Sequence, residues 1–200
     1  TDLLHWEYLP CAIAPDSPYD NGPGCFSGSA TEMDDGRQLL MYTSVVSEKQ
    51  PNGEMREIQT QSVAVGDGLD YEKPACNPVL TQKDLPEGFS KFDFRDPKIW
   101  REDGMYYMVV GNRTPDTSGS ILYFKSEDAI HWEFINKLAS CHNQYGKMWE
   151  CPDFFPLDNK YVLLTSPQEM NAVGLEFHPG NANVCIIGEL NEQKNHLLRD

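Results

Sequence analysis

The sequence is poor in basic residues and lacks long apolar runs, and each shortage removes a class of protein. It has 16 Lys and Arg against 31 Asp and Glu, a formal net charge of −15. Nucleic acids and anionic membrane surfaces attract basic proteins, so we expect neither as a partner. No run of about 18 apolar residues occurs, so no membrane-spanning helix is expected. The opening "TDLLHWEY" also lacks the basic and apolar segments of a signal peptide.

Metal-binding and cofactor motifs are absent as well. None of the six cysteines forms a C-x-x-C pair, and no histidine stands at zinc-ligand spacing from them. No phosphate-binding loop or redox motif is present, so we expect no metal and no cofactor. We interpret the cysteines as reduced, small and buried apolar residues, which indicates a cytoplasmic protein. They are Cys11, Cys25, Cys76, Cys141, Cys151 and Cys185.

Helical periodicity is also missing, and strand signals take its place. "RQLLMYTSVV", "GMYYMVVGNR" and "NKYVLLTSPQ" are short runs rich in Val, Tyr, Leu and Met, and each begins at a polar turn containing Gly or Asn. The 14 prolines are spread along the chain. These features predict an all-β fold.

An aromatic motif recurs along the chain. Its central residues are Trp6, Tyr71 and Trp132, which are 65 and 61 positions apart. His5 and His131 precede the tryptophan in two of the copies, and we interpret them as structural because they recur. We expect each copy to be a strand. The copies are "LLHWEYLP" at 3–10, "GLDYEKPA" at 68–75 and "AIHWEFIN" at 129–136.

A strand module of about 60 residues is typical of a β-propeller, whose blades are four-stranded sheets around an axis. Propellers have at least four blades, but this chain holds about three and ends at "NHLLRD" with no closing strand in view. We therefore expect residues 1–200 to be a partial propeller domain that lacks the first inner strand and the last blades. Unpaired blade edges would favour self-association. A β-sandwich is the alternative fold.

The repeat also aligns three unusual polar segments. Nine residues before the turn residues Gly36, Gly104 and Asn159 stand Ser27, Arg95 and Glu150. First strands of successive blades line the axis of a propeller, so we expect these three positions to face one pocket.

The segments themselves resemble the motifs of glycoside hydrolase family 32. They are "CFSGSA" at 25–30, "FRDPKIW" at 94–100 and "WECPDFF" at 149–155, and "DLLHWEYLPCAIAPD" resembles the segment that precedes the first motif in that family. The family contains invertases, sucrose-6-phosphate hydrolases, levanases and inulinases. The resemblance covers nearly the whole chain. It implies a five-bladed β-propeller that hydrolyses β-D-fructofuranosidic bonds with retention of configuration.

The resemblance also implies roles for single residues. Glu150 would be the general acid/base, and Asp96 would hold the fructose hydroxyls and stabilise the transition state. Arg95 would pair with a neighbouring carboxylate and touch the sugar. Phe26 and Ser27 would contact the substrate at the pocket rim.

A carboxyl group beside aromatic residues suits this chemistry. A glycosidic oxygen is a poor leaving group unless it is protonated, so one carboxyl must keep a proton near working pH. Aromatic neighbours of Glu150 can exclude water and favour the protonated form. Trp149 is predicted to form a wall of the sugar pocket, with a place in the core as the alternative.

A retaining mechanism also needs a nucleophilic carboxylate about 5–5.5 Å from the acid. The resemblance places that aspartate in an N-D-P-N-G motif, which does not occur here. "YDNGPG" at 19–24 is only superficially similar, which makes Asp20 a weak candidate. We expect the chain to begin downstream of the true nucleophile and to be inactive alone.

Simpler interpretations of each residue stay open. Glu150 alone could be a paired core glutamate, Asp96 could open a turn, and Arg95 could be a structural ion-pair partner. "FSGS" could be plain strand-edge sequence. For the whole protein, the alternatives are a non-catalytic sugar-binding propeller and a related five-bladed glycosidase acting on arabinose polymers. The choice among sucrose, sucrose 6-phosphate and fructan is open.

Overall fold

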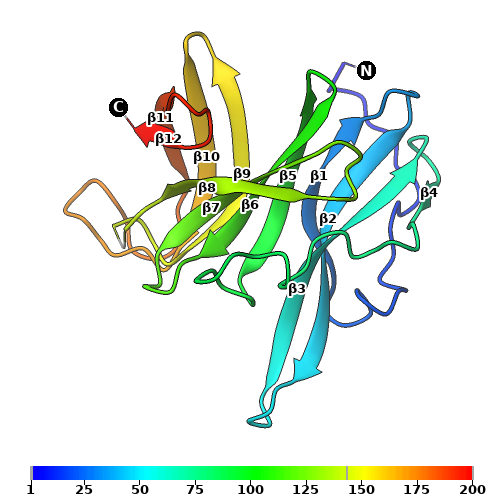
Figure 1. Ribbon diagram of the computed structural model, residues 1–200, viewed down its shortest axis with the longest axis horizontal. Coiled ribbons are helices and arrows are strands. Elements are labelled where there is room, and N and C mark those ends of the chain that lie inside the picture. The colour runs from blue at the N-terminus through cyan, green and yellow to red at the C-terminus, as the bar shows by residue number, and fades with distance from the viewer. Residues whose placement is uncertain (1, 143, 200) are drawn as a thin grey trace.

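Over residues 2–142 and 144–199, the computed structural model contains twelve β strands arranged in three four-stranded antiparallel sheets (Figure 1). The first sheet is formed by β1 (Gly24–Glu32), β2 (Gln38–Lys49), β3 (Met55–Gly66) and β4 (Tyr71–Glu72). The second is formed by β5 (Phe94–Glu102), β6 (Met105–Arg113), β7 (Gly119–Ser126) and β8 (Glu133–Ser140). The third is formed by β9 (Met148–Leu157), β10 (Lys160–Gln168), β11 (Val184–Leu190) and β12 (Leu197–Arg199).

The first strands of the three sheets lie side by side, as Figure 1 shows for β1, β5 and β9. The Ser29 hydroxyl on β1 donates to the Pro97 carbonyl at 2.8 Å and accepts from the Ile99 amide at 2.8 Å. The Cys151 amide on β9 donates to the Asp96 carboxylate on β5 at 2.9 Å. This is the blade arrangement that the repeat predicts, so the all-β propeller prediction is confirmed.

Two hydrophobic clusters fill the spaces between neighbouring sheets. Alternate residues of a strand point to opposite faces, so Met108 enters the cluster beside the first sheet and Val109 the cluster beside the third. Both are fully buried. The second sheet is therefore covered on both faces, which explains why "MYYMVV" is apolar at nearly every position.

The polar turns predicted from the sequence form hairpins. β1 and β2 are joined at Gly36, and β5 and β6 at Gly104, with φ angles of 81° and 82°. This left-handed region favours glycine. β9 and β10 are joined through Asp158 and Asn159, with φ of 52° at Asp158.

The aromatic repeat is present as a recurring turn. The Asp128 carboxylate accepts from the amides of Ile130 and His131 at 2.9 and 2.8 Å, and its second oxygen contacts His131 Nδ1 at 2.7 Å. Asp2 makes the same contacts with Leu4 and His5. Both histidines thus belong to turns, in agreement with their structural interpretation.

The strand predicted at 3–10 is wrong, because that segment has no β structure. A strand needs a neighbour to accept and donate its backbone hydrogen bonds, and no described strand pairs with these residues. Trp6 is 82% exposed, whereas Trp132 packs against the core of the second sheet. The copy at 68–75 forms only the two-residue strand β4.

Two further expectations need correction. The third sheet does have a closing strand, because Leu197–Arg199 pairs with β11. This strand has only three residues, which are too few to show the alternation of apolar and polar residues that marks a strand in a sequence. All six cysteines are free thiols, but Cys11, Cys76, Cys151 and Cys185 are exposed and only Cys141 is fully buried. Cys11 and Cys76 lie in irregular segments, whereas Cys151 and Cys185 lie on β9 and β11 with exposed side chains.

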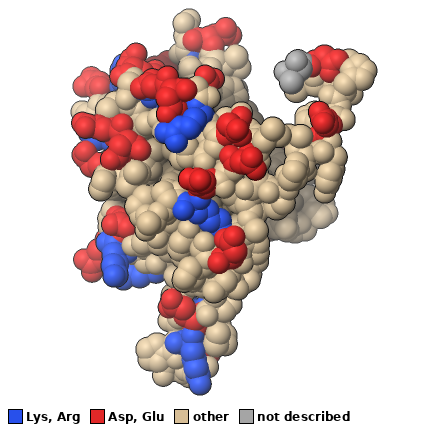
Figure 2. All heavy atoms as spheres, turned by 90° about the vertical axis from the view of Figure 1, so that its right-hand side faces the viewer, with Lys and Arg blue, Asp and Glu red and all other residues tan. Residues whose placement is uncertain are grey.

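Acidic side chains are spread widely over the face seen in Figure 2, with fewer Lys and Arg among them. This pattern agrees with the net charge of −15. Within the described parts of the chain, no helix is long and apolar enough to cross a membrane.

Candidate active site

Each of the three inner strands carries a β-bulge at its motif. The register shifts between Cys25 and Gly28 in β1 and between Arg95 and Lys98 in β5. In β9 it shifts between Glu150 and Asp153. A bulge bends the strand and redirects side chains, and bulges are frequent next to active sites. The three bulges therefore occupy equivalent places on the inner strands.

Ser27, however, lies inside its bulge, whereas Arg95 and Glu150 each come just before theirs, so the predicted alignment is wrong by two positions for Ser27. The reason is that the β1–β2 turn at 33–37 is longer than the turns at 103–104 and 158–159.

Two of the bulges contain non-glycine residues in the left-handed region. The φ angles are 63° at Asp96 and 46° at Cys151. Such conformations cost free energy and persist where the surroundings hold them, often at functional sites. The backbone thus marks the same two motifs that the sequence singles out.

Arg95 and Glu150 form an ion pair across the second and third sheets. Arg95 Nε lies 2.8 Å from Glu150 Oε1, and the Arg95 side chain is only 11% exposed. Its other nitrogens contact Gln59 at 3.3 Å, Asp93 at 3.4 Å and Gln168 at 3.2 Å. The guanidinium is therefore held on all sides, and it fixes the position of the Glu150 carboxylate.

Trp149 and Phe154, the aromatic residues near Glu150 in the sequence, do not surround its carboxylate. Trp149 is 1% exposed and points into the core, where its indole N–H donates to the Tyr145 carbonyl at 2.7 Å. Phe154 is also buried in that core and stacks on Tyr161. Since neighbouring strand residues face opposite sides, Trp149 and Glu150 cannot share the pocket. Trp149 therefore occupies the core and does not line the pocket.

Trp149 packs directly against two glycines of the second sheet. A Cβ on Gly119 would stand 2.3 Å from Trp149 Cδ1, and a Cβ on Gly111 would stand 2.3 Å from the Trp149 carbonyl oxygen. Real Cβ atoms do not approach so closely. The absence of side chains at both positions allows β9, and with it Glu150, to lie against the second sheet.

Asp96 is 7% exposed and is held from both neighbouring sheets. Its amide donates to the Thr43 hydroxyl at 2.9 Å, and its carboxylate accepts from the Cys151 amide at 2.9 Å. The Cys151 thiol lies 3.6 Å from the same carboxylate oxygen. Burial, together with the negative charge of Asp96, raises the pKa of the Cys151 thiol to about 11.

The predicted residues line two recesses. The larger, of about 470 Å³, is lined by Phe26, Arg56, Glu57, Gln59, Phe92, Asp93, Arg95 and Glu150. The smaller, of about 230 Å³, is lined by Ser27, Gly28, Ser29, Asp96, Pro97, Lys98, Cys151, Pro152 and Asp153. The chain neighbours Glu150 and Cys151 connect them. The structure thus places Phe26, Arg95 and Glu150 in one recess, and Ser27 and Asp96 in the other. The prediction that Ser27 faces the same pocket as Arg95 and Glu150 is therefore wrong.

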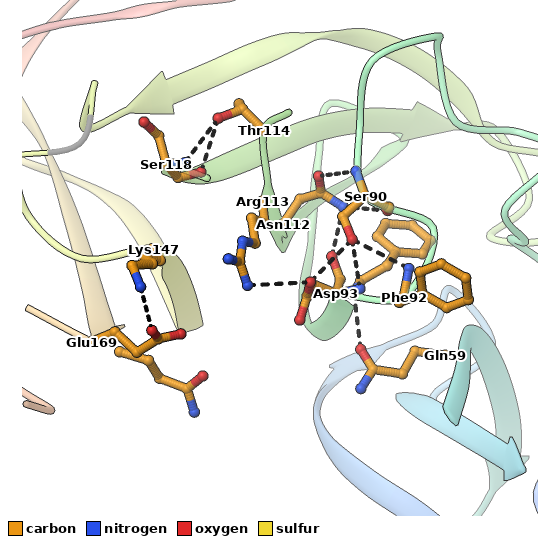
Figure 3. Close-up of polar contacts among 12 residues, drawn as sticks. Gln59, Ser90, Phe92, Asp93, Asn112, Arg113, Thr114, Ser118, Lys147 and Glu169 are labelled. Carbon is orange, nitrogen blue, oxygen red and sulfur yellow. Dashed lines mark hydrogen bonds and ion pairs between the residues drawn. The ribbon is translucent and has the colours of Figure 1, made fainter. Parts of the chain in front are cut away.

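Several lining residues of the larger recess have no motif in the sequence. Arg56 on β3 places its guanidinium 4.8 Å from the centre of the Phe92 ring. Asp93 accepts a hydrogen bond from the Ser90 hydroxyl at 3.1 Å and lies 4.0 Å from Arg113 (Figure 3). The only available signal was that Asp93 stands two residues before Arg95.

Asp20 lies apart from both recesses. Its side chain is fully buried and accepts from the Ser17 amide at 2.8 Å, the Tyr42 hydroxyl at 3.0 Å and the Lys73 ammonium at 2.6 Å. No described group of three or more His, Cys, Asp or Glu side chains is arranged to hold a metal ion.

Three successive blades, with Arg95 and Asp96 on the inner strand β5 and Glu150 on the inner strand β9, define the class: a β-propeller fold with a polar site on its inner strands. The model of the glycosyl hydrolases family 32 N-terminal domain matches residues 1–200. The chain therefore belongs to glycosyl hydrolase family 32.

Relatives and solved structures agree with this assignment. Raffinose invertase from Escherichia coli is 40% identical over 179 residues, covering 88% of the chain and 36% of the relative. Sucrose-6-phosphate hydrolase from Zymomonas mobilis is 38% identical over 199 residues, which cover 94% of the chain and 37% of the relative.

Among solved structures, a family 32 β-fructofuranosidase from Bombyx mori, a mutant in complex with sucrose, superposes with a TM-score of 0.86 at 33% identity. The superposition covers 100% of the chain and 40% of the Bombyx mori protein. Sucrose-6-phosphate hydrolase from Lactobacillus gasseri superposes with a TM-score of 0.78 at 31% sequence identity. The match covers 99% of the chain and 39% of that protein. The chain thus spans 36–40% of the length of these four proteins.

Proposed function

We propose that the protein to which this chain belongs hydrolyses β-D-fructofuranosidic bonds by a retaining double displacement, with sucrose or sucrose 6-phosphate as substrate. The observation that carries the proposal is the convergence of three bulged motifs, which brings Phe26, Arg95 and Glu150 to one recess. The names of the relatives, invertase and sucrose-6-phosphate hydrolase, support the substrate class.

Glu150 is the proposed general acid/base. Its side chain is 25% exposed at the recess, so a glycosidic oxygen can approach it. Arg95 holds one carboxylate oxygen at 2.8 Å and leaves the other for the proton transfer. Protonation of the leaving oxygen then makes departure of the leaving sugar feasible.

Asp96 is the proposed partner of the fructose hydroxyls. A carboxylate that binds hydroxyls more tightly as oxocarbenium character develops stabilises the transition state relative to the ground state. Its left-handed backbone and the Cys151 amide fix the carboxylate before substrate arrives. Arg95, Phe26 and Ser27 are the proposed sugar contacts beside it.

The nucleophile is not assigned to a residue of this chain. Asp20 was the weak candidate, but it is fully buried and engaged by Tyr42 and Lys73. We therefore expect residues 1–200 alone to release little or no fructose, because loss of a covalent nucleophile costs orders of magnitude in rate.

The decisive experiment measures fructose release from sucrose and sucrose 6-phosphate at matched concentrations. It compares the chain alone with a protein in which the chain is extended to the length of its relatives by segments of a sucrose-6-phosphate hydrolase. In the extended protein, Glu150→Gln should lower kcat by about 10²–10⁴-fold. Glu133→Gln is the matched control, because Glu133 pairs with Lys125 at 3.2 Å and lines neither recess.

Two results would change the conclusion. An extended protein that binds sugars without cleaving either substrate indicates the non-catalytic binding propeller. Cleavage of arabinose polymers in preference to fructosides indicates the related glycosidase.

A further inference from the structure

A buried chain of polar groups connects the first sheet to the bulge at Asp96. The Asp96 amide donates to Thr43 Oγ1 at 2.9 Å, and the Thr43 hydroxyl donates to Gln61 Oε1 at 2.8 Å. Gln61 Nε2 then donates to the Phe94 carbonyl at 2.8 Å, which closes the path on β5. Thr43 on β2 and Gln61 on β3 are fully buried.

The bulge explains why this connection is needed. The register shift between Arg95 and Lys98 takes Asp96 out of the hydrogen-bonded ladder with β6. Its amide therefore needs another acceptor, because a buried amide without one is costly. Thr43 supplies that acceptor, and its own proton is fixed by Gln61 so that the oxygen lone pair faces Asp96.

The same sheet holds the residues just before Asp96. Gln59, two residues before Gln61 on the same face of β3, accepts from the Phe94 amide at 2.9 Å and from Arg95 at 3.3 Å. Gln59 and Gln61, alternate residues of one strand, thus bind the amide and the carbonyl of Phe94. A left-handed aspartate persists only where its surroundings over-determine it, and these contacts meet that condition.

We propose that Thr43 and Gln61 are positioning residues, which hold the left-handed turn at Asp96 so that its carboxylate faces the Cys151 amide and the space beside Glu150. The structural part of this inference stands on the contacts alone. Its consequence for catalysis rests on the proposed function.

Cys151 provides a reporter that does not depend on activity. Its thiol is exposed, and the neighbouring Asp96 carboxylate helps to hold its pKa near 11. If the carboxylate turns away, the pKa of the thiol falls. Each unit of decrease gives about tenfold more thiolate at pH 8, and with the accompanying loss of nucleophilicity the alkylation rate rises about threefold.

The test measures the rate at which iodoacetamide modifies Cys151 in the chain at pH 8, followed by mass spectrometry of the Cys151 peptide. Thr43→Val removes the acceptor at nearly constant volume and should raise the rate about threefold. Thr43→Ser retains the hydroxyl and should restore the wild-type rate. Ser44→Ala is the matched control, because Ser44 is buried on the same strand but bonds Thr60 and Ser62 instead.

The kinetic arm uses the extended protein described above. Thr43→Val should lower kcat roughly 10- to 100-fold, because a displacement of about 1 Å is costly in catalysis, while Thr43→Ser restores it to within about threefold of wild type. If Thr43→Val does not fold, as judged by circular dichroism, Gln61→Met removes both amide contacts and is measured instead.

The outcomes separate the two proposals. An unchanged Cys151 rate in folded Thr43→Val, or no increase in Asp96→Asn, overturns the positioning inference. An increased rate in Thr43→Val, with no fructose release by any extended wild-type protein, leaves the positioning inference standing and refutes the proposed function.

Discussion

Two carboxylate–cation pairs of similar length serve different purposes in this molecule. Lys73 lies 2.6 Å from Asp20, and Arg95 lies 2.8 Å from Glu150. The Asp20 side chain is 0% exposed and also accepts from Ser17 and Tyr42, whereas the Glu150 side chain is 25% exposed. No second hydrogen bond reaches the Glu150 carboxylate from the described residues.

The difference indicates how a reactive carboxylate can be told from a structural one. Asp20 is bound by several donors and fully buried, so it connects the segment before β1 to the first sheet and cannot be reached by a ligand. Glu150 is fixed by one partner and open to a recess. Incomplete satisfaction, together with exposure to a recess, therefore distinguishes the candidate acid.

The largest expected change in stability comes from breaking the Asp20 pair. Lys73→Met should lower the free energy of unfolding by about 3–5 kcal/mol, because it leaves a buried carboxylate without its cation. Urea denaturation of the chain measures this. Lys125→Met, which breaks the exposed pair with Glu133, should cost less than about 1 kcal/mol. Equal losses of stability in the two variants would show that the buried Asp20 pair contributes no more than an exposed pair.

Tyr42→Phe should have the next largest effect. The Tyr42 hydroxyl donates to Asp20 at 3.0 Å, and burial followed by this bond raises the pKa of Tyr42. Loss of a hydrogen bond to a charged group costs about 1.5–3 kcal/mol. The same urea experiment checks it, and a cost below about 0.5 kcal/mol would show that Asp20 does not need this donor.

Glu150→Gln should change stability by about 1 kcal/mol or less, since the amide oxygen can still accept from Arg95 and the group is partly exposed. Thermal and urea unfolding of the chain test this. A loss as large as that of Lys73→Met would make Glu150 a structural residue like Asp20 and weaken the proposed acid role.

The smallest effect concerns alkaline pH. Burial lowers the pKa of Lys73, but its hydrogen bonds to Asp16 and Asp20 outweigh this, so the pKa is raised above its ordinary value of 10.5. The stabilisation is then fully present below pH 10.5 and is lost as pH rises through the higher folded-state pKa. The stability difference between wild type and Lys73→Met should be constant from pH 7 to about 10 and shrink above that. A difference that shrinks already between pH 7 and 9 would contradict the shift.

Much of the fold could be predicted from the sequence because the blades repeat. The spacing from the turn residues Gly36, Gly104 and Asn159 aligned the three motifs without a structure. The bulges show that the alignment is correct for Arg95 and Glu150 and off by two positions for Ser27, because the first turn is longer than the other two.

Other features depend on contacts that the sequence does not encode locally. The turns at Asp2 and Asp128 are nearly identical, yet only the second is followed by a strand, because only there does a neighbouring strand lie alongside. Arg56 and Phe92 reach the recess from β3 and a loop, so no motif marks them. Trp149 faces the core because strand alternation sends it away from Glu150.

Gly111 and Gly119 influence the shape of the recess because they lack side chains. Since Trp149 rests on the bare backbone at both positions, even one added methyl group there would act as a wedge between the second and third sheets. At Gly111 the added group would meet the backbone oxygens of Trp149 and Arg95, and at Gly119 it would meet the Trp149 ring, so it would move the strand that carries Glu150 away from the second sheet. The distance between the second and third sheets at the candidate site thus depends on two glycines that line neither recess.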